Sequence, residues 1–223
     1  MIAAFPCPGP SGQCEEYALV FDQGRHNRIL IVPALFDEAN RMRRMLVDTM
    51  RLLDAHGVDT FLPDLPGCNE SLQDFTTQSL HGWRGAMENA ARHFRATDVL
   101  AIRGGALVYP AAMPGWVLEP AKGPSILRQM LRARIIAARE AGRHEDSAAL
   151  LEQGRTEGLE LAGYRFGAGL IAGLQDALPQ IEGQRLIAQA ELGGAGLWLR
   201  AEPSAAPEQS VALCRIIAAD LGT

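Results

Sequence analysis

The sequence lacks an apolar stretch long enough to cross a membrane. Its longest apolar segments, "RILIVPALF" and "VLAIRGGALVYPAAMPGWVL", are too short or too interrupted for the roughly 20 apolar residues that a membrane helix needs. The first residues, "MIAAFPCPGPSGQ", lack the basic start and the long apolar stretch of a secretory signal. We therefore expect a cytoplasmic protein that does not insert into membranes.

Excess positive charge is also absent. The formal net charge is −5, whereas a general nucleic-acid binder shows a basic footprint. We therefore expect no nucleic-acid partner. Hydrophobic residues make up 48% and charged residues 21% of the chain, which are globular values and exclude a largely disordered protein.

Cysteine is scarce and unclustered. Cys7, Cys14, Cys68 and Cys214 show no CxxC spacing, and in a reducing compartment we interpret them as thiols. Cys7 and Cys14 could lie close in space, but a metal site would need more ligands than the sequence supplies there. We expect no metal and no cofactor.

Strand-like and helix-like patterns alternate over the first half of the chain. Two strand-like stretches, 15–24 and 25–36, are expected to form a hairpin that leads into a central strand. Helical patterns follow at 38–57 and 80–96, separated by a strand that begins at Val58, and another strand begins at Thr97. This alternation predicts an α/β fold with a mostly parallel sheet flanked by helices. At 223 residues, we expect a single domain over 1–223.

The pattern becomes predominantly helical after Pro110. Residues 114–160 are predicted to form a helical cap or lid over a pocket at the carboxyl ends of the strands. A further small-residue helix, a strand at "QRLIAQAEL" and a carboxyl-terminal helix complete the chain.

The stretch "AIRGG", residues 101–105, predicts a sharp turn from a strand into a helix. Gly104 and Gly105 permit the close packing that such a turn needs. Arg103 cannot act as a nucleophile because its side chain stays protonated. It can instead bind a carboxylate or phosphate, or it can pair with an internal acid, for which Glu38 and Asp37 are the simplest candidates. Both interpretations stay open at this point.

A second turn is predicted at "PDLPGCNES", residues 63–71, where Asn69 tolerates a left-handed backbone. Cys68 and Ser71 lie in this loop and are weak candidates for a nucleophile, and Glu38 is a weak candidate for activating a water. A thiolate needs a nearby base or positive charge. None of the five histidines lies in the last quarter of the chain.

These stretches resemble the α/β-hydrolase superfamily. "AIRGG" is similar to the G-x-S-x-G turn that carries the serine in that superfamily, and "DLPGCNES" is similar to its D-x-x-G-x-G-x-S loop. More narrowly, the chain resembles the second group of hydrolase-like proteins encoded with the exosortase A system. The residues that match this group are Pro33, Glu38, Asn40, Arg43, Arg44, Met45, Arg103, Glu160, Ala162, Gly163 and Tyr164.

The resemblance spans most of residues 30–178. It implies an α/β-hydrolase-like fold with a cap insertion in a bacterial protein linked to exopolysaccharide production and to the sorting of PEP-CTERM proteins. The chain departs from the superfamily in having Arg103 for the serine, Pro33 and Ala34 for the usual His-Gly, and no carboxyl-terminal histidine. A Ser-Asp-His triad is therefore not recognisable.

Three hypotheses follow. In the first, a non-catalytic or diverged hydrolase-like protein binds a small anionic or acyl molecule. The residues expected to line its pocket are Arg103, Glu38, Asn40, Arg43 and Tyr164, with Trp198 as an apolar wall. In the second, the chain is an ester or thioester hydrolase that uses Cys68, Ser71 or a water activated by Glu38. In the third, it is a scaffold that forms a homodimer through the helices that carry Arg128, Arg132, Arg134 and Arg139.

Overall fold

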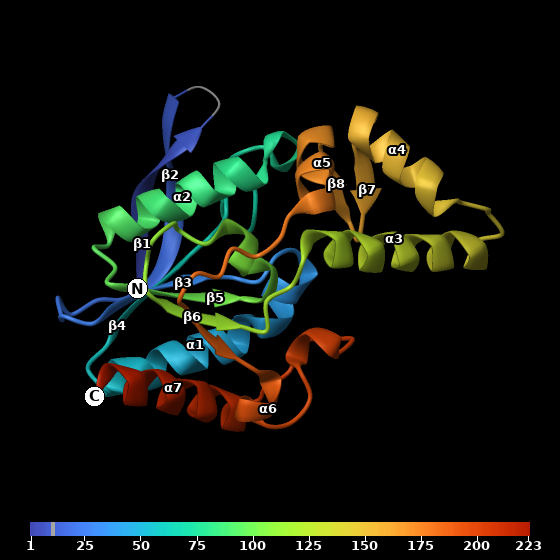
Figure 1. Cartoon of the computed structure of the whole chain (residues 1–223). Coiled ribbons are helices and arrows are strands. Elements are labelled where there is room, and N and C mark those ends of the chain that lie inside the picture. Colours follow the sequence, from blue (N-terminus) through green and yellow to red (C-terminus); the bar gives the residue numbers. More distant parts are fainter. Residues whose placement is uncertain (10–11) are drawn as a thin grey trace.

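The computed structural model describes residues 1–9 and 12–223. Within them, seven strands form one sheet in the order β1-β2-β4-β3-β5-β6-β9 (Figure 1). The strands are β1 Ile2–Gly9, β2 Gly12–Phe21, β3 Arg28–Val32, β4 Asp59–Pro63, β5 Asp98–Ile102, β6 Gly115–Leu118 and β9 Arg185–Ile187. The five strands from β4 to β9 in this order are parallel, and β1 and β2 are antiparallel to their neighbours. The predicted α/β fold with a mostly parallel sheet is confirmed.

The hairpin expected between 15–24 and 25–36 is wrong. β2 pairs with β1, with Cys7 opposite Cys14, and on its other side with β4, with Ala18 opposite Pro63. β4 therefore separates β2 from β3. The strand β1 was not predicted because its sequence, IAAFPCPG, contains two prolines, which sheets tolerate mainly at an edge. β1 is an edge strand.

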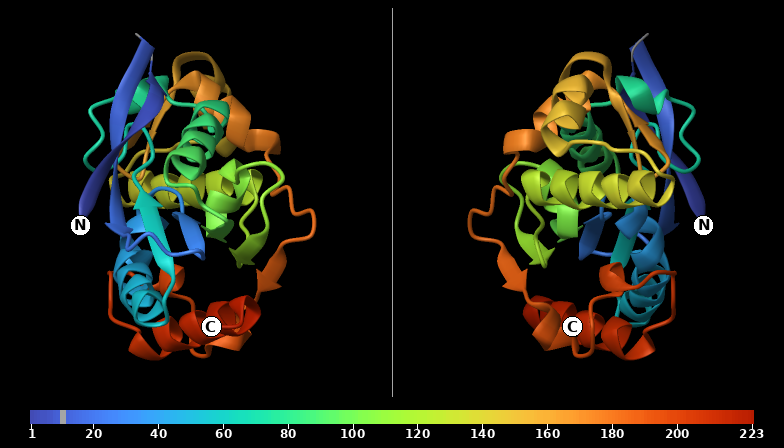
Figure 2. Two further views of the ribbon diagram at one scale, coloured as in Figure 1. Left: turned by 90° about the vertical axis from the view of Figure 1, so that its left-hand side faces the viewer. Right: turned by 90° about the vertical axis from the view of Figure 1, so that its right-hand side faces the viewer.

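Helices cover both faces of the sheet (Figure 2). One face carries α1 Asp37–Ala55, α6 Gln189–Leu192 and α7 Pro207–Leu221, and the other carries α2 Leu80–His93. Met42, Met45 and Met50 of α1 are buried against Ile29 and Ile31 of β3. A short 3₁₀ helix, Phe75–Thr77, lies between β4 and α2.

A cap lies at the end of the sheet to which the arrowheads of β5 and β6 point (Figure 1). It consists of α3 Gly123–Glu140, α4 Ser147–Glu157, the two-stranded hairpin β7 Leu159–Leu161 and β8 Tyr164–Phe166, and α5 Ala168–Asp176. The predicted boundary at residue 114 is wrong, because residues 115–118 form β6 within the central sheet. The helical part of the cap begins at Gly123.

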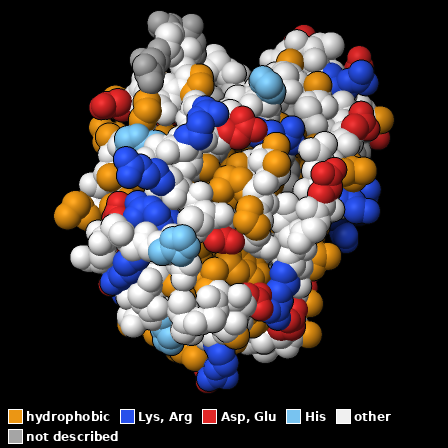
Figure 3. Space-filling model, turned by 60° about the vertical axis from the view of Figure 1, so that its left-hand side comes forward, with side chains coloured by type: hydrophobic (Ala, Val, Ile, Leu, Met, Phe, Trp, Pro, Cys, Tyr) orange, Lys and Arg blue, Asp and Glu red, His pale blue; other side chains and the backbone are white. Residues whose placement is uncertain are grey.

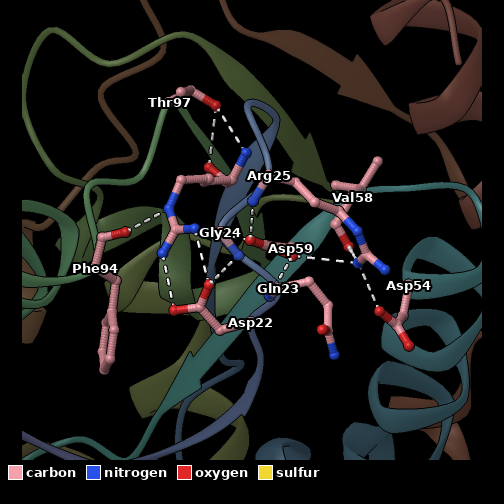
Figure 4. Close-up of polar contacts among 10 residues, drawn as sticks. Asp22, Gln23, Gly24, Arg25, Asp54, Val58, Asp59, Phe94 and Thr97 are labelled. Atoms are coloured by element: carbon pink, nitrogen blue, oxygen red, sulfur yellow. Dashed lines mark hydrogen bonds and ion pairs between the residues drawn. The ribbon is translucent and has the colours of Figure 1, made fainter.

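The opposite end of the sheet holds an ion cluster around Asp59, which is fully buried at the start of β4 (Figure 4). Its carboxylate accepts hydrogen bonds from the backbone amides of Gln23 and Arg25 at 3.0 and 2.8 Å. It also pairs with the guanidinium groups of Arg25 and Arg28 at 3.2 and 2.7 Å. Arg28 in turn binds both oxygens of Asp22 and the carbonyl of Phe94. This cluster fixes the amino ends of β3 and β4.

The surface carries both signs of charge. On the face drawn in Figure 3, acidic and basic side chains are interspersed and hydrophobic ones gather near the middle. Among the described residues, no helix has both the length and the apolar character that a membrane span requires.

Candidate functional site

Arg103 stands directly after β5, at the turn predicted from "AIRGG". Its φ is 52°, a left-handed conformation that costs a residue other than glycine about 1–3 kcal/mol. Gly105 is required by its surroundings, because a Cβ there would lie 2.4 Å from the carbonyl oxygen of Pro33. The sharp turn is therefore present. The helix that follows is a six-residue 3₁₀ helix, Arg103–Val108.

The guanidinium of Arg103 is held on three sides. Its Nε and Nη2 donate to the two carboxylate oxygens of Glu38 at 3.1 and 3.3 Å. Its Nη1 donates to the carbonyl oxygen of Glu119 at 2.9 Å, and its Cζ lies 4.2 Å from the centroid of the Trp198 ring. The Arg103 and Glu38 side chains are only 15% and 9% exposed. The internal pair considered in the sequence analysis is thus formed with Glu38 and not with Asp37.

The pair leaves part of the guanidinium free. A guanidinium has five N–H groups, and Glu38 and Glu119 accept three of them. Two therefore remain without a protein acceptor among the described residues. Arg103 thus keeps two donors in reserve and is held in place by the strand end and the ring of Trp198.

A cavity of about 130 Å³ lies beside Glu38. It is lined by Leu35, Phe36, Asp37, Glu38, Arg41, Ile126, Gln129, Met130, Ala133 and Ala162. The first five residues come from the loop after β3 and the first turns of α1, and the others come from α3 and the β7–β8 hairpin of the cap. The cavity therefore lies at the carboxyl end of the parallel strands, where open α/β sheets bind ligands.

The sequence analysis did not single out Arg41, which lines this cavity. Arg41 pairs with Asp37 at 2.6 Å and donates to the carbonyl oxygen of Trp198 at 2.8 Å. It follows Glu38 by three residues, so both side chains face the same side of α1. That spacing was the signal available in the sequence. Glu119 was also missed, although it directly follows β6 at the edge where parallel strands end.

Of the six predicted pocket residues, Glu38 alone lines the cavity. Arg103 pairs with Glu38 and lies against Trp198, whereas Asn40 and Arg43 lie elsewhere. Asn40 is exposed, and Arg43 is exposed and pairs with Asp64 at 3.3 Å. Neither lines the cavity. Positions 40 and 43 lie on the side of α1 that is turned away from Glu38 and Arg41, because the helical period separates them. The structure does not bring Asn40 and Arg43 to Arg103.

Tyr164 lies in an aromatic cluster next to the cavity. Its ring centroid is 5.9 Å from that of Phe36 and 5.3 Å from that of Phe75. Burial, together with the charges of Cys68 and Asp37, raises the pKa of the Tyr164 hydroxyl. Phe36 itself lines the cavity and has a φ of 59°. Tyr164 therefore supports the wall of the cavity through Phe36.

Cys68 and Ser71 lie in the loop after β4, as predicted, and Asn69 has the expected left-handed φ of 50°. Burial, and then the carboxylates of Asp64 and Glu16, raise the pKa of the Cys68 thiol to about 12. The Ser71 hydroxyl donates to the buried Glu16 carboxylate at 2.8 Å and accepts from the amide of Gly67 at 2.7 Å. Neither residue lines the cavity.

Nucleophilic and metal chemistry find little support in these geometries. The thiol of Cys68 stays protonated at neutral pH, because a pKa of about 12 leaves almost no thiolate. The oxygen of Ser71 is engaged in the turn. Among the described residues, no three His, Cys, Asp or Glu side chains group in a way that could hold a metal ion.

Comparisons with known proteins bear on the fold. No family model matches the sequence, and no curated protein matches it. Among solved structures, the chain is similar to Est1E from Butyrivibrio proteoclasticus, solved with ferulic acid bound. The TM-score is 0.52 at 18% identity, over 72% of this chain and 67% of Est1E.

Two further solved structures are similar over different shares of their length. A thermophilic esterase from Thermogutta terrifontis has a TM-score of 0.48 at 14% identity, over 80% of this chain and 74% of that one. Alpha/beta hydrolase domain-containing protein 10 from mouse has a TM-score of 0.45 at 11% identity, over 60% of this chain and 54% of that one. The chain thus spans about half to three quarters of the length of these three proteins.

The strand order and the likeness to Est1E together decide the architecture. The chain has an α/β-hydrolase fold. In this fold the strand-to-helix turn after the central strand carries the nucleophile, and the loop after the neighbouring strand contributes to the oxyanion hole. Arg103 therefore stands at the nucleophile position, and Glu38 extends to it from the helix that follows that loop.

Proposed function

We propose that this α/β-hydrolase-fold chain is a binding protein without hydrolase chemistry, which takes a small anionic or acyl molecule in the cavity beside Glu38. The observation that carries the proposal is Arg103 at the nucleophile position, held by Glu38, Glu119 and Trp198. A guanidinium stays protonated, so this position offers hydrogen-bond donors where a hydrolase offers an attacking oxygen.

The composition of the cavity supports this ligand class. Arg41 lines the cavity and pairs with Asp37, and Arg103 adds positive charge through its pair with Glu38, which also lines the cavity. The remaining walls are mostly apolar, and Leu35, Phe36 and Met130 among them are buried. A few charged groups within an apolar lining are typical of small-molecule sites, in which the polar groups orient the ligand.

A hydrolase that uses Cys68 or Ser71 is the less favoured alternative. Both residues lie outside the cavity, and a nucleophile has to be activated by a base within hydrogen-bond reach. Burial, and then the carboxylates of Asp64 and Glu16, raise the pKa of the Cys68 thiol, so it stays protonated.

The cellular setting belongs to the same proposal. The resemblance to the exosortase A group supports a bacterial cytoplasmic role linked to exopolysaccharide production. The gene neighbourhood of the chain tests this setting independently of the ligand, because genes for an exosortase and for PEP-CTERM proteins are expected beside it.

Titration calorimetry with acetate, butyrate and hexanoate tests the binding function, alongside assays with p-nitrophenyl esters of the same acids. We expect binding to the native protein, loss of binding in Arg103→Ala and no ester turnover by either. Circular dichroism has to show that the variant is folded. A folded Arg103→Ala protein that binds unchanged contradicts the proposal, and turnover that disappears in Cys68→Ser or Ser71→Ala restores the hydrolase alternative.

A further inference from the structure

The pair between Arg103 and Glu38 has the geometry of a bound ligand. Two parallel N–H···O bonds join the Nε and Nη2 of Arg103 to the two oxygens of one carboxylate, which is how arginine recognises carboxylate ligands. The carboxylate belongs to a side chain that also lines the cavity. Glu38 thus occupies, from within the chain, the place that the carboxylate of a ligand would take.

Arg103 does not depend on Glu38 for its position. The carbonyl of Glu119 accepts from Nη1 at 2.9 Å, and the Trp198 ring lies 4.2 Å from Cζ. Both contacts, and the backbone position at the end of β5, remain if Glu38 turns away. The two donors are therefore preorganised for any planar carboxylate, and preorganisation lowers the cost of binding.

Glu38 has another cation within reach when it leaves. Arg41 follows it by three residues on α1 and lines the same cavity, and side chains at this spacing are neighbours on a helix. Arg41 now pairs with Asp37, whose side chain is 40% exposed and can be solvated by water. The displaced carboxylate would therefore not be left buried without a partner.

The size and walls of the cavity restrict the tail of the ligand. About 130 Å³ corresponds to roughly four water molecules at about 30 Å³ each. Ile126 and Met130 from α3 and Leu35 from the loop after β3 are apolar. This combination fits a short hydrocarbon tail, which a phosphate lacks.

We infer that the ligand is a short-chain monocarboxylate that displaces the carboxylate of Glu38 from Arg103. The inference rests on the proposed binding function and adds the ligand class and a specificity-determining residue to it. Glu38 acts as an internal competitor, so only a carboxylate that also gains apolar contacts with the cap binds in its place.

Glu38→Asp is the decisive variant. It keeps the charge and the acidic start of α1 but withdraws the carboxylate by one carbon–carbon bond, about 1.5 Å, so that it no longer reaches Arg103. Butyrate affinity, measured by calorimetry, is expected to rise about tenfold, which corresponds to about 1.4 kcal/mol. Glu38→Gln is expected to raise it similarly, because a neutral amide competes less well for a guanidinium.

Asp37→Asn is the matched control. It removes a charge from the same helical turn and the same cavity but has no contact with Arg103. We expect its butyrate affinity to change less than twofold. An equal gain in Asp37→Asn and Glu38→Gln, with none in Glu38→Asp, would mean that only net charge matters, and it would overturn the displacement. Butyramide and inorganic phosphate should bind at least tenfold more weakly than butyrate to every variant.

The outcomes separate the inference from the function on which it rests. If butyrate binds the native protein and Glu38→Asp leaves its affinity unchanged, the ligand uses the two remaining N–H groups of Arg103 beside an unmoved Glu38, and the inference is wrong while the function stands. Phosphate that binds as tightly as butyrate refutes the ligand class alone. If no carboxylate binds the native protein or either Glu38 variant, the proposed function itself fails.

Discussion

Two arginine–carboxylate clusters lie at opposite ends of the same sheet, and they differ in how completely they are satisfied. At the amino ends of the strands, the Asp59 carboxylate accepts four N–H groups and is fully buried. At the carboxyl ends, Arg103 has two N–H groups to spare and Glu38 faces a cavity. The buried Asp59 carboxylate thus finds all its partners within the protein and serves stability, whereas Arg103 keeps unpaired donors beside a paired residue that lines a cavity and can serve recognition.

The largest expected effect on stability comes from removing Asp59 from its ion cluster. Asp59→Ala leaves Arg25 and Arg28 without their shared partner, and removing one partner of a buried ion pair costs about 3–5 kcal/mol. The free energy of unfolding, measured with urea, is expected to fall by this amount. Butyrate affinity of the protein that remains folded should be unchanged, since the two clusters are at opposite ends of the strands. A loss below 1 kcal/mol would show that the Asp59 cluster is not a stability element.

A smaller loss of unfolding free energy is expected from replacing Arg103. Arg103→Gly leaves Glu38 without its partner, but it also relieves the left-handed backbone at φ 52°, which costs about 1–3 kcal/mol. The net loss in unfolding free energy should be about 2 kcal/mol, below that of Asp59→Ala. Arg103→Ala keeps the backbone strain and serves as the control. If the glycine variant is no more stable than the alanine variant, the turn is not strained.

Acid should weaken the ion cluster around Asp59 over a defined range of pH. The hydrogen bonds from Arg28 lower the pKa of Asp22 to about 2, while an unfolded chain has an ordinary aspartate pKa of about 3.9. A lowered pKa stabilises the fold above about pH 4, and this contribution is lost as the pH falls toward 2. Unfolding free energies of the native protein and Asp22→Asn should differ at pH 5 and converge near pH 2. Parallel curves over this range would contradict the assignment.

The smallest effect is expected at Cys68, whose thiol is kept protonated by burial and then by the carboxylates of Asp64 and Glu16. With a pKa of about 12, Cys68 has a thiolate fraction of only about one in ten thousand at pH 8. Its alkylation by iodoacetamide, followed by mass spectrometry, should be far slower in the folded protein than in urea. Cys68→Ser identifies the modified site. Rapid labelling of the folded chain would return Cys68 to the nucleophile candidates.

The sequence allows prediction of the features that depend on local chemistry. The turn at Arg103 follows from two glycines after an apolar strand, and the left-handed Asn69 follows from its neighbours in a turn-rich loop. Local patterns also identified α1 and α2 and the parallel strands β4 and β5 that follow them. In contrast, β1 contains two prolines and so has no strand pattern that could be read without knowing that it lies at an edge.

The partners of Arg103 show where prediction from sequence ends. Glu38 could be proposed because the ends of parallel strands meet, but the Glu119 carbonyl and the Trp198 ring carry no signal in the residues around Arg103. Asn40 and Arg43 were expected in the pocket because they share a motif with Glu38. The rotation of α1 by about 100° per residue separates them from it, and only the packed helix shows which of its sides faces the cavity.

Trp198 has a consequence for how the chain folds. Its carbonyl binds Arg41 across 157 positions of sequence, and its ring covers Arg103. Contacts between such distant segments form late, because closing a long loop has to precede them. The ion pair at the turn can form as soon as β3, α1 and β5 have assembled, but its aromatic cover arrives only with the last part of the chain. During synthesis, the paired arginine therefore lacks its aromatic cover until the segment around Trp198 has packed.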